Sequence, residues 1–577
     1  MKLDWQGEQK KFEGQIKWNM RDSERFLSEI KHGVGRNAYF EAAGYKRSNL
    51  LGGGQGPRHA ISHDVRKNAA YVAANNALRL TDEKLKVLDL NLSWDDESIK
   101  NWAESKSKEC SRLADTSPLP GFMIRELVHS YGLTFPQFCM FGLEGAIART
   151  KSAAWWRRQA RVLQARKKDQ LARSLRLVHQ KAQVYCSNEA VRFRRVQVAR
   201  NRAILESMEA TNNEADVYTL AELSDLSNSN PEIRRNELMV RMRGFEEVAD
   251  ELGHVGVFIT TSCPSAYHPT KQIFGSSGRC VRVVKNQNYN GATPREAHAW
   301  QTKTWELARA KLSREGIRVY GFRVVEPHHD GTPHWHGLFF LEPELLDDFK
   351  AIIRAYWLRE FADEAGAKKY RTKVVDIDKS RGSAAGYIAK YIAKNIDGTH
   401  IAEDLLGKPA ADSAERICAW ASCWGIRQFQ QIGGPSVTVW RELRRIDPHE
   451  DEAIEEIRKA ASDDSDWAAF CMLMGGPMGE RANVPLRAAR WLETNEETGE
   501  FLDCPVNRYG EDSKGCVFGL ECMKTGKFIL SRFYRWSIDR VGAAVESLLE
   551  TFEKTEEELS DEQLDFLRGP GGGYGFT

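Results

Sequence analysis

Apolar residues between positions 230 and 253 recur every three or four residues, which is the spacing of one face of a helix. They are Leu238, Met242, Phe245, Ala249 and Leu252. Asn230 followed by Pro231 is typical of an N-cap and a first helical position, and Gly253 is typical of a helix end. The pattern therefore predicts a helix of about twenty residues over 231–252.

The segment that follows predicts a small sheet. Its β-rich runs are GVFITT (256–261), IRVYGFRVVE (317–326) and HWHGLFFL (334–341). Between the first two runs, Thr293–Glu296 is typical of a capping box and starts a helix that reaches Arg314. The turn-like HHDGTP joins the last two runs into a hairpin. Strand, helix and hairpin in this order predict an α+β domain, an antiparallel sheet with helices packed on one face.

Composition narrows the class of protein. The chain has 577 residues, enough for about four domains, and 83 basic against 81 acidic residues. No apolar stretch approaches the roughly 18 residues of a membrane span, and the N-terminus lacks the apolar core of a signal peptide. Eleven cysteines without a C-x-x-C pair favour reduced thiols. We therefore expect no membrane association and a cytoplasmic location.

Although the net charge of the chain is close to zero, basic and acidic residues are concentrated in different segments. Residues 149–202 hold sixteen Lys or Arg against two acids, a net charge of +14. Residues 447–466 hold nine acids and two bases, and residues 541–567 hold nine acids and one Lys. The first segment has the charge of a surface that binds nucleic acid.

Four of the fourteen histidines lie within nine positions, at His328, His329, His334 and His336. Residues at i and i+2 of a strand share a face, so His334 and His336 point together while Trp335 points toward a core. Two adjacent imidazoles provide two ligands of a metal site.

The sequence does not decide which residue is the third metal ligand. Glu326 ends the partner strand of the hairpin and would complete an N,N,O set, whereas His328 or His329 could replace it. Such a set suits Mg²⁺ or Mn²⁺ in the cell. The competing interpretation is a His-rich surface hairpin that binds no metal.

A second group of reactive side chains lies in GSAAGYIAKYIAKN (382–395), a predicted helix that Ser383 can cap. Tyr387 and Tyr391 are neighbours at i, i+4, and Lys390 and Lys394 lie beside them. Taken alone, this pattern favours an amphipathic helix with half-buried tyrosines and solvated lysines.

Together the two groups predict phosphodiester chemistry. A divalent metal polarises the phosphate, and a tyrosine hydroxyl is a nucleophile that forms a covalent ester. Free tyrosine is only about 0.1% ionised at pH 7, so the developing charge needs stabilisation, to which Lys390 or Lys394 can contribute. The chain has no G-x-x-x-x-G-K-[ST] nucleotide-binding motif, so DNA unwinding must come from a partner helicase.

These motifs resemble the two-tyrosine class of HUH endonucleases, and most closely the phage replication gene A protein family. VFITTSCPSAYH (257–268), VVEPHHDGTPHWHGLFF (324–340) and GSAAGYIAKYIAKN are similar, in this order, to that family's first, metal and nucleophile motifs. Similar segments from about 150 to 445 extend the resemblance: WWRRQARVL (155–163), NPEIRRNELMVRMRGFE (230–246) and IRQFQQIGGPSVTVWRELRR (426–445).

The resemblance implies a function. The protein would nick one strand at a single-stranded origin, stay on the 5′ phosphate through Tyr387 or Tyr391, and leave a 3′ hydroxyl as primer for a host DNA polymerase. The second tyrosine would attack the regenerated origin after one round, which completes rolling-circle replication of a phage or prophage genome. His334, His336 and Glu326 would hold the metal.

The basic segment is expected to hold DNA. The residues predicted to do so are Trp155, Trp156, Arg157, Arg158, Arg161, Lys167 and Lys168, with the two indoles stacking on unpaired bases. The alternative is a solvated basic helix that packs through a stripe of Leu171, Leu175 and Val178.

These motifs and charge patterns predict four regions: a largely helical N-terminal region of unknown role (1–145), a helical basic region (146–253), an HUH endonuclease domain (254–445), and an acidic C-terminal region, α+β or helical, with a flexible tail (446–577). The competing functions are a plasmid relaxase, a two-tyrosine transposase, and an origin-binding protein without catalysis. A zinc peptidase is disfavoured because the chain has no H-E-x-x-H.

Overall fold

The computed structural model describes residues 76, 87–92, 94–136, 142–278, 280–398, 410–490, 507–511 and 515–541. The acidic segment 541–567 and the predicted flexible tail lie outside these residues, apart from position 541. Within the described part, none of the helices has the length and apolar character needed to cross a membrane.

The chain forms two compact units, of which the first comprises residues 1–175 and 508–511. Its helices are α4 (Asp96–Thr116), α5 (Pro120–Ser130), α6 (Leu143–Thr150) and α7 (Ala153–Ser174). Trp102, Tyr131 and Trp156 form the centre of its core, with ring centroids 5.3 to 5.9 Å apart. This unit is helical in its described part, as the sequence predicts.

The second unit comprises residues 176–507 and 512–577. Its helices are α8 (Asn188–Glu206), α9 (Leu220–Asp225), α10 (Pro231–Leu252), α11 (Pro294–Arg314), α12 (Leu346–Trp357), α13 (Ala367–Tyr370), α14 (Ala384–Ile396), α15 (Ala410–Trp424), α16 (Val437–Leu443), α17 (Glu452–Ser462) and α18 (Trp467–Leu473). Its strands are β1 (Met208–Asn212), β2 (Val217–Thr219), β3 (Val255–Ser262), β4 (Thr270–Phe274), β5 (Cys280–Lys285), β6 (Tyr320–Pro327), β7 (Pro333–Leu341), β8 (Thr372–Asp376), β9 (Phe429–Ile432), β10 (Leu486–Arg490), β11 (Val517–Cys522), β12 (Phe528–Leu530) and β13 (Trp536–Arg540).

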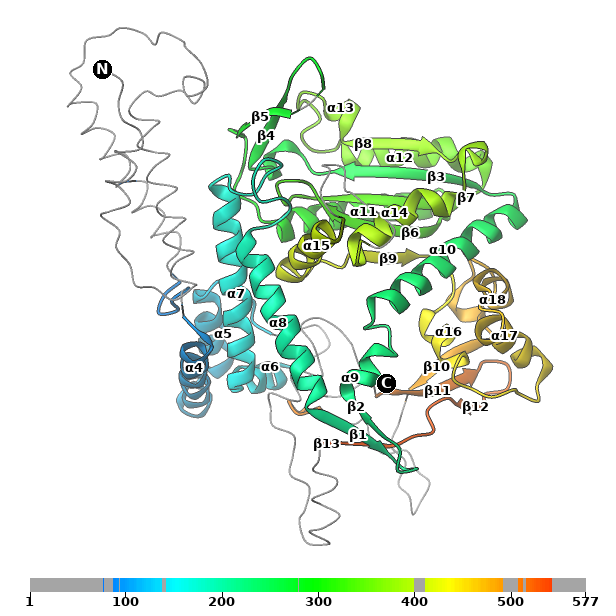
Figure 1. The fold of residues 1–577 in the computed structure, drawn as a ribbon, viewed down its shortest axis with the longest axis horizontal. Helices are drawn as coiled ribbons and strands as arrows, with labels where there is room; N and C mark the ends of the chain where they lie inside the picture. The colour runs from blue at the N-terminus through cyan, green and yellow to red at the C-terminus, as the bar shows by residue number, and fades with distance from the viewer. Residues whose placement is uncertain are drawn as a thin grey trace. The chain divides into compact units, whose positions relative to one another are not determined.

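A five-stranded antiparallel sheet organises this unit. Its strand order is β8-β3-β7-β6-β9, which Figure 1 shows from top to bottom of the view. The predicted hairpin of β6 and β7 lies at its centre, with Glu326 opposite His334. Smaller sheets have the orders β13-β1-β2, β10-β11-β12 and β4-β5. The fold is therefore mixed α/β with antiparallel sheets.

Helices cover both faces of the five-stranded sheet, so the prediction of helices on one face is wrong. One face packs in a core with α10, α14 and α18, and the other face packs in a core with α11, α12 and α15. The cause is visible in β6, where every residue is buried. Phe322 and Val324 point to the first core and Val325 to the second, so neither face can be left in water.

The predicted helix over 231–252 is confirmed as α10. The Asn230 side chain accepts the amide of Glu232, and Gly253 ends the helix with a φ of 69°. Of the predicted apolar face, only Leu252 is exposed, because it lies in the last turn, beyond the part of α10 that packs on the core. The capping box of α11 at Thr293 and Glu296 is also confirmed.

The predicted region boundaries do not coincide with the cores. The basic segment 149–202 is divided between the two units at Leu175, where α7 has ended, so Val178 is not part of the predicted helical stripe. Beyond residue 446, Trp467 and Phe470 pack in the same core as α10 and the sheet. Their large apolar side chains bind this acidic segment to the sheet domain.

Phe245→Ala tests the core that carries α10. Phe245 is fully buried between Tyr320 and Trp467, with ring centroids 5.4 and 5.8 Å away. We expect the substitution to lower the free energy of unfolding of the second unit by about 3–5 kcal/mol, because it removes buried area and leaves a cavity. Urea unfolding followed by circular dichroism measures the change.

Leu252→Ala, on the same helix, is the matched control and should change that free energy by no more than about 0.5 kcal/mol. Equal effects of the two substitutions would contradict the assignment of Phe245 to the core.

Candidate functional site

Alternation along the central strands brings the predicted metal ligands together. His334 and His336 lie on the same side of β7 as Leu338 and Phe340, which belong to the core that includes α14. Glu326 lies at the end of β6, directly opposite His334. The three side chains therefore face the helix that carries the tyrosines.

The three groups form a compact cluster. The Oε2 atom of Glu326 lies 3.9 Å from His334 Nε2 and 3.7 Å from His336 Nε2. One nitrogen or oxygen of each residue lies within 4.8 Å of the others. A single ion placed among them would have two imidazole nitrogens and a carboxylate oxygen in reach.

An unpaired nitrogen indicates that this set fits a metal. His336 Nε2, the nitrogen that lies nearest Glu326, is buried and has no hydrogen-bond partner within the described part of the chain. The other ring nitrogen of His336, Nδ1, lies 3.1 Å from Thr260 Oγ1, which orients the ring. Buried polar atoms without partners are unfavourable, and coordination of a cation would satisfy them.

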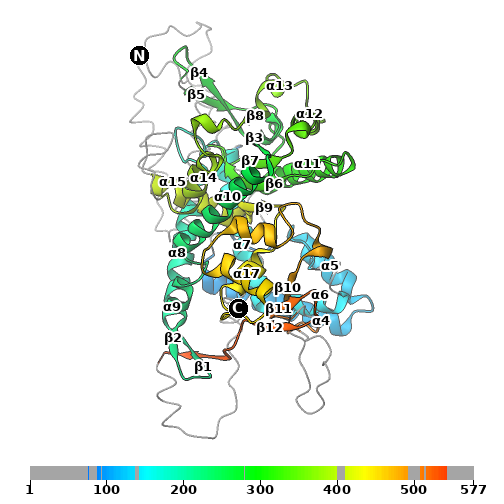
Figure 2. The same cartoon turned by 90° about the vertical axis from the view of Figure 1, so that its right-hand side faces the viewer.

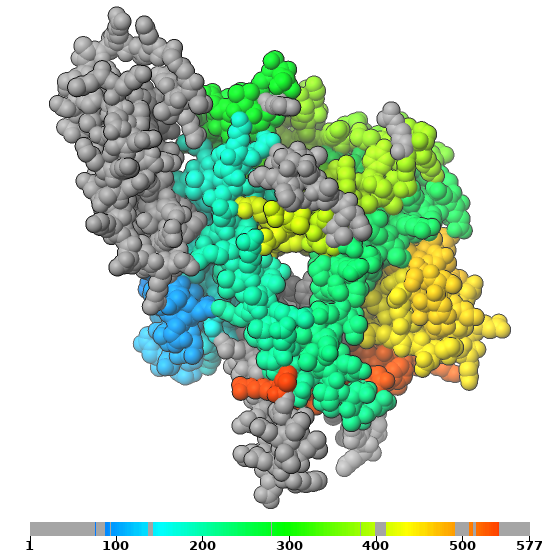
Figure 3. All heavy atoms as spheres, viewed as in Figure 1, coloured from blue at the N-terminus to red at the C-terminus, as the bar shows by residue number. Residues whose placement is uncertain are grey.

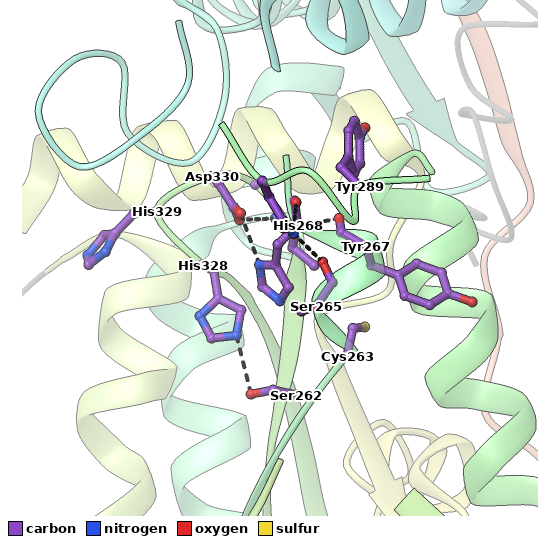
Figure 4. Close-up of polar contacts among 12 residues, drawn as sticks. Ser262, Cys263, Ser265, Tyr267, His268, Tyr289, His328, His329 and Asp330 are labelled. Atoms are coloured by element: carbon purple, nitrogen blue, oxygen red, sulfur yellow. Dashed lines mark hydrogen bonds and ion pairs between the residues drawn. The ribbon is translucent and has the colours of Figure 1, made fainter. Parts of the chain in front are cut away.

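His328 and His329 do not join this cluster, so Glu326 is the third member among the described residues. The His328 ring packs against His334 with centroids 4.1 Å apart, and its Nε2 lies 3.3 Å from Ser262 Oγ. Figure 4 shows His328 and His329 pointing in different directions from one loop. His329 packs against Tyr185 instead.

The Glu326 carboxylate is buried and has partners on both oxygens. Lys394 Nζ lies 3.0 Å from Oε2, and the Asn395 side-chain amide donates to Oε1. Burial would raise the pKa of Glu326, but contact with His336 and the charge of Lys394 outweigh it and lower this pKa to about 2. The carboxylate is therefore charged at neutral pH, as a metal ligand must be.

Helix α14 begins as predicted, with the Ser383 hydroxyl accepting the amide of Gly386. A carboxylate from α10 adds a second cap, because Glu246 accepts the amides of Ala384 and Ala385 at 2.5 and 2.9 Å. At the other end, Arg235 forms an ion pair with Asp397, directly after the last residue of the helix.

The two tyrosines occupy different surroundings. The Tyr391 ring lies 4.1 Å from the His336 ring and 5.6 Å from Phe258, measured between centroids. Tyr387 lies one turn earlier and packs against Phe258 at 6.4 Å. Burial, and to a smaller extent the charge of Glu326, raise the pKa of Tyr391 above its ordinary value.

The two lysines also differ. Lys390 Nζ is exposed on its helix and lies 5.1 Å from the centroid of the Tyr391 ring. Lys394 Nζ bonds to Glu326 and lies 5.5 Å from the centroid of the Tyr185 ring. Lys390 therefore lies beside Tyr391, and Lys394 is bonded to the Glu326 carboxylate.

Asn395 is a residue of this site that the sequence motifs did not predict. Its side chain is fully buried, donates to Glu326, and lies 2.6 Å from the Tyr391 carbonyl. Gln428 Nε2 donates in turn to Asn395 Oδ1 at 3.1 Å. The available signal was its position four residues after Tyr391, where an apolar residue would suit a helix face that packs on a sheet.

The prediction that Trp155 and Trp156 stack on DNA bases is wrong. Both indoles are buried in the core of the first unit, where their centroids lie 4.9 Å apart, and Trp156 Nε1 donates to the Thr150 carbonyl. An aromatic pair in a basic helix is compatible with either role, and here packing against Trp102 decides it.

The predicted basic DNA contacts of α7 are only partly available at the surface. Lys167 is exposed, Arg157 and Arg158 are half-buried, and Lys168 is buried. Arg161 forms an ion pair with Asp96 at 3.1 Å. DNA contact by this helix stays a prediction.

The comparisons with known proteins agree on one family of phage replication proteins. Residues 130–399 match the sequence model of the family described as Bacteriophage replication gene A protein (GPA). The chain is 38% identical over 418 residues to the Replication gene A protein of Escherichia phage 186, covering 70% of this chain and 57% of that relative. It is 36% identical over 406 residues to the Replication protein of Haemophilus phage HP1, with 69% and 49% covered.

A bacterial relative is similar over a comparable length. The chain is 32% identical over 407 residues to a Probable replication endonuclease from prophage-like region of Salmonella typhimurium, with 67% and 49% covered. The chain thus spans about half to three fifths of the length of these curated relatives. No solved structure matches the chain significantly.

Asn395→Ala tests whether the buried amide positions the metal ligands. We expect it to weaken binding of Mn²⁺ about 10- to 100-fold, because partners that orient a ligating carboxylate typically contribute this much. Titration of Mn²⁺ followed by electron paramagnetic resonance measures the affinity, and Glu326→Gln should weaken binding at least as much.

Asn288→Ala is the matched control, since Asn288 is exposed and lies outside the cluster. Equal Mn²⁺ affinities of Asn395→Ala and Asn288→Ala, with unchanged circular dichroism, would separate Asn395 from metal binding.

Proposed function

Because the chain belongs, through residues 130–399, to the bacteriophage replication gene A protein family, we propose that it is a metal-dependent, site-specific single-strand DNA endonuclease and strand transferase. In this proposal it nicks a replication origin through a 5′-phosphotyrosine bond and starts rolling-circle replication of a phage or prophage genome. The sheet domain would then be an HUH endonuclease domain.

One observation carries the proposal. Tyr391 packs at 4.1 Å on the ring of His336, and His336 belongs to the cluster of Glu326 and the two histidines. A nucleophile and a candidate metal site from segments far apart in the sequence thus share one side of the sheet. A structural tyrosine needs no buried, unpaired imidazole nitrogen beside it.

Glu326, His334 and His336 would hold Mg²⁺ or Mn²⁺. A bound ion of this kind supplies positive charge that polarises a phosphodiester. Glu326 and His336 are buried, which limits the access of water to their ligand atoms.

The covalent step exchanges one ester bond for another. The phenol oxygen of the attacking tyrosine forms a bond to phosphorus, and the bond from phosphorus to the 3′ oxygen breaks. The phenol loses its proton, and the departing oxygen gains one to become the 3′ hydroxyl. The energy of the ester is retained, so the same site can rejoin strands when a 3′ hydroxyl attacks the phosphotyrosine.

Lysines complete the charge balance in this mechanism. Lys390, beside the Tyr391 ring, is positioned to offset phenolate or phosphate charge. Lys394 holds Glu326 and keeps this carboxylate ionised. Tyr387, one turn away, would attack in the next round.

DNA is the proposed substrate, and a host helicase and DNA polymerase are the proposed partners. A plasmid relaxase or a transposase could use the same chemistry. The phage role is preferred because relatives from two phages carry the names replication gene A protein and replication protein. The chain spans only part of those relatives, so their complete activity is proposed and not assumed.

The Tyr387→Phe, Tyr391→Phe and double variants test the chemistry. We expect wild-type protein, with Mn²⁺, to form a denaturation-resistant adduct with one of a set of labelled single-stranded oligonucleotides that tile the gene for this chain. The double variant should form none, because phenylalanine has no nucleophilic oxygen. Gel electrophoresis and mass spectrometry locate the adduct.

Each single variant should retain an adduct at the remaining tyrosine, and EDTA should abolish all of them. Tyr289→Phe, a tyrosine outside α14, serves as control. DNA binding without any adduct in wild-type protein would support an origin-binding protein and refute the nickase.

The raised pKa of Tyr391 predicts how the rate of adduct formation by the Tyr387→Phe variant depends on pH. Because burial disfavours the phenolate, most Tyr391 stays protonated at neutral pH, and the reactive fraction grows as pH rises. Single-turnover adduct formation should increase about tenfold per pH unit between about pH 6.5 and 8.5. A plateau within this range would show that a group with a lower pKa controls the step.

A further inference from the structure

Strands β4 and β5 form a two-stranded ribbon apart from the five-stranded sheet. They pair antiparallel from Thr270 opposite Lys285 to Phe274 opposite Cys280. Figure 2 shows the ribbon at the top of the second unit, above β8, β3 and β7, and Figure 3 shows this bright green part of the chain at the surface. A ribbon of two strands is marginally stable in water unless it is anchored.

The base of the ribbon is anchored next to the candidate metal cluster. Asn286 Nδ2 donates to the carbonyls of Ser265 and His268 at 2.7 and 2.8 Å. His268 Nδ1 lies 2.9 Å from Asp330, in the loop between β6 and β7 (Figure 4). From within β4, Gln272 Nε2 lies 3.3 Å from His329 Nδ1 in the same loop.

Apolar side chains of the ribbon are exposed. Ile273, Phe274 and Val281 are 40%, 59% and 61% exposed. Apolar groups gathered on one projecting element expose area that folding normally removes from water. They therefore indicate an interaction surface.

The ribbon is also basic. Lys271, Arg282 and Lys285 are exposed, and none of them pairs with an acid among the described residues. No Asp or Glu occurs in the sequence between Glu251 and Glu296. The ribbon therefore attracts anionic groups.

The arrangement of these side chains suits nucleic acid. Directly paired residues share a face, and Ile273 is opposite Arg282 while Lys271 is opposite Val284. Lys271, Ile273, Arg282 and Val284 thus share one face, while alternation places Phe274 and Lys285 on the other. Each face therefore carries basic and apolar groups side by side, which suits the phosphates and bases of an unpaired strand that passes around the ribbon. A surface that inserts into a membrane needs an apolar face separated from its charges.

We propose that the β4–β5 ribbon binds the DNA strand beside the scissile phosphate, with Phe274 stacked on an unpaired base and Lys271, Arg282 and Lys285 on phosphates. This inference rests on the proposed function, which makes DNA the substrate. Five residues of a strand extend about 17 Å, so these contacts fall within about five nucleotides of the cluster.

Binding of the full chain to a fluorescein-labelled oligothymidylate, without metal, tests the ribbon by anisotropy. The variant Lys271→Gln/Arg282→Gln/Lys285→Gln should reduce the slope of log affinity against log salt by about 2, from three lost phosphate contacts on a single strand. Phe274→Ala should bind at least about fivefold more weakly with an unchanged slope.

The matched charge control is Lys303→Gln/Arg309→Gln/Arg314→Gln on α11, which covers the opposite face of the sheet from α14. It should leave both slope and affinity as in wild type. Wild-type binding by the ribbon variants, or an equal loss in the control, would overturn the inference. If the ribbon variants bind DNA as wild type does but lose binding to phosphatidylglycerol vesicles, the ribbon is a membrane contact, and the inference is also overturned.

Adduct formation is measured in parallel and separates the two proposals. Ribbon-dependent binding without any adduct refutes the nickase and keeps the ribbon as a DNA contact. An adduct together with unchanged binding by the ribbon variants refutes the ribbon and keeps the nickase.

Discussion

The buried carboxylate of Glu326 is the group on which the rest of the site depends. A charge removed from water is unfavourable unless each of its oxygens has a partner. Here the partners come from β7, through the histidines, and from α14, through Lys394 and Asn395. The sheet and the helix must therefore meet at one place and in one register for this carboxylate to stay ionised.

Local signals in the sequence predicted the elements of this site well. Asn230, Thr293 and Ser383 each start the helix expected of them, because an N-cap acts within a few residues of itself. The face of β7 that carries both histidines follows from alternation alone. Glu326 opposite His334 follows from the length of the hairpin loop.

Features that depend on distant residues could not be predicted in the same way. The covering of both sheet faces depends on helices from several parts of the chain. Trp156 is buried because Trp102, far from it in sequence, packs on it. Asn395 gains its role from Glu326, 69 residues earlier in the chain. In each case the deciding contact joins residues whose proximity no local pattern encodes.

Helix α14 is held at both ends: Glu246 caps its start, Glu326 bonds to Lys394 in its last turn, and Arg235 binds Asp397, the residue after it. Four residues along a helix correspond to a rise of about 6 Å, so two tyrosines on a fixed helix present their oxygens at separate heights. If both tyrosines react with one kind of phosphate in succession, as proposed above, the nucleic acid would shift relative to this helix between the two reactions, because the helix is held at both ends.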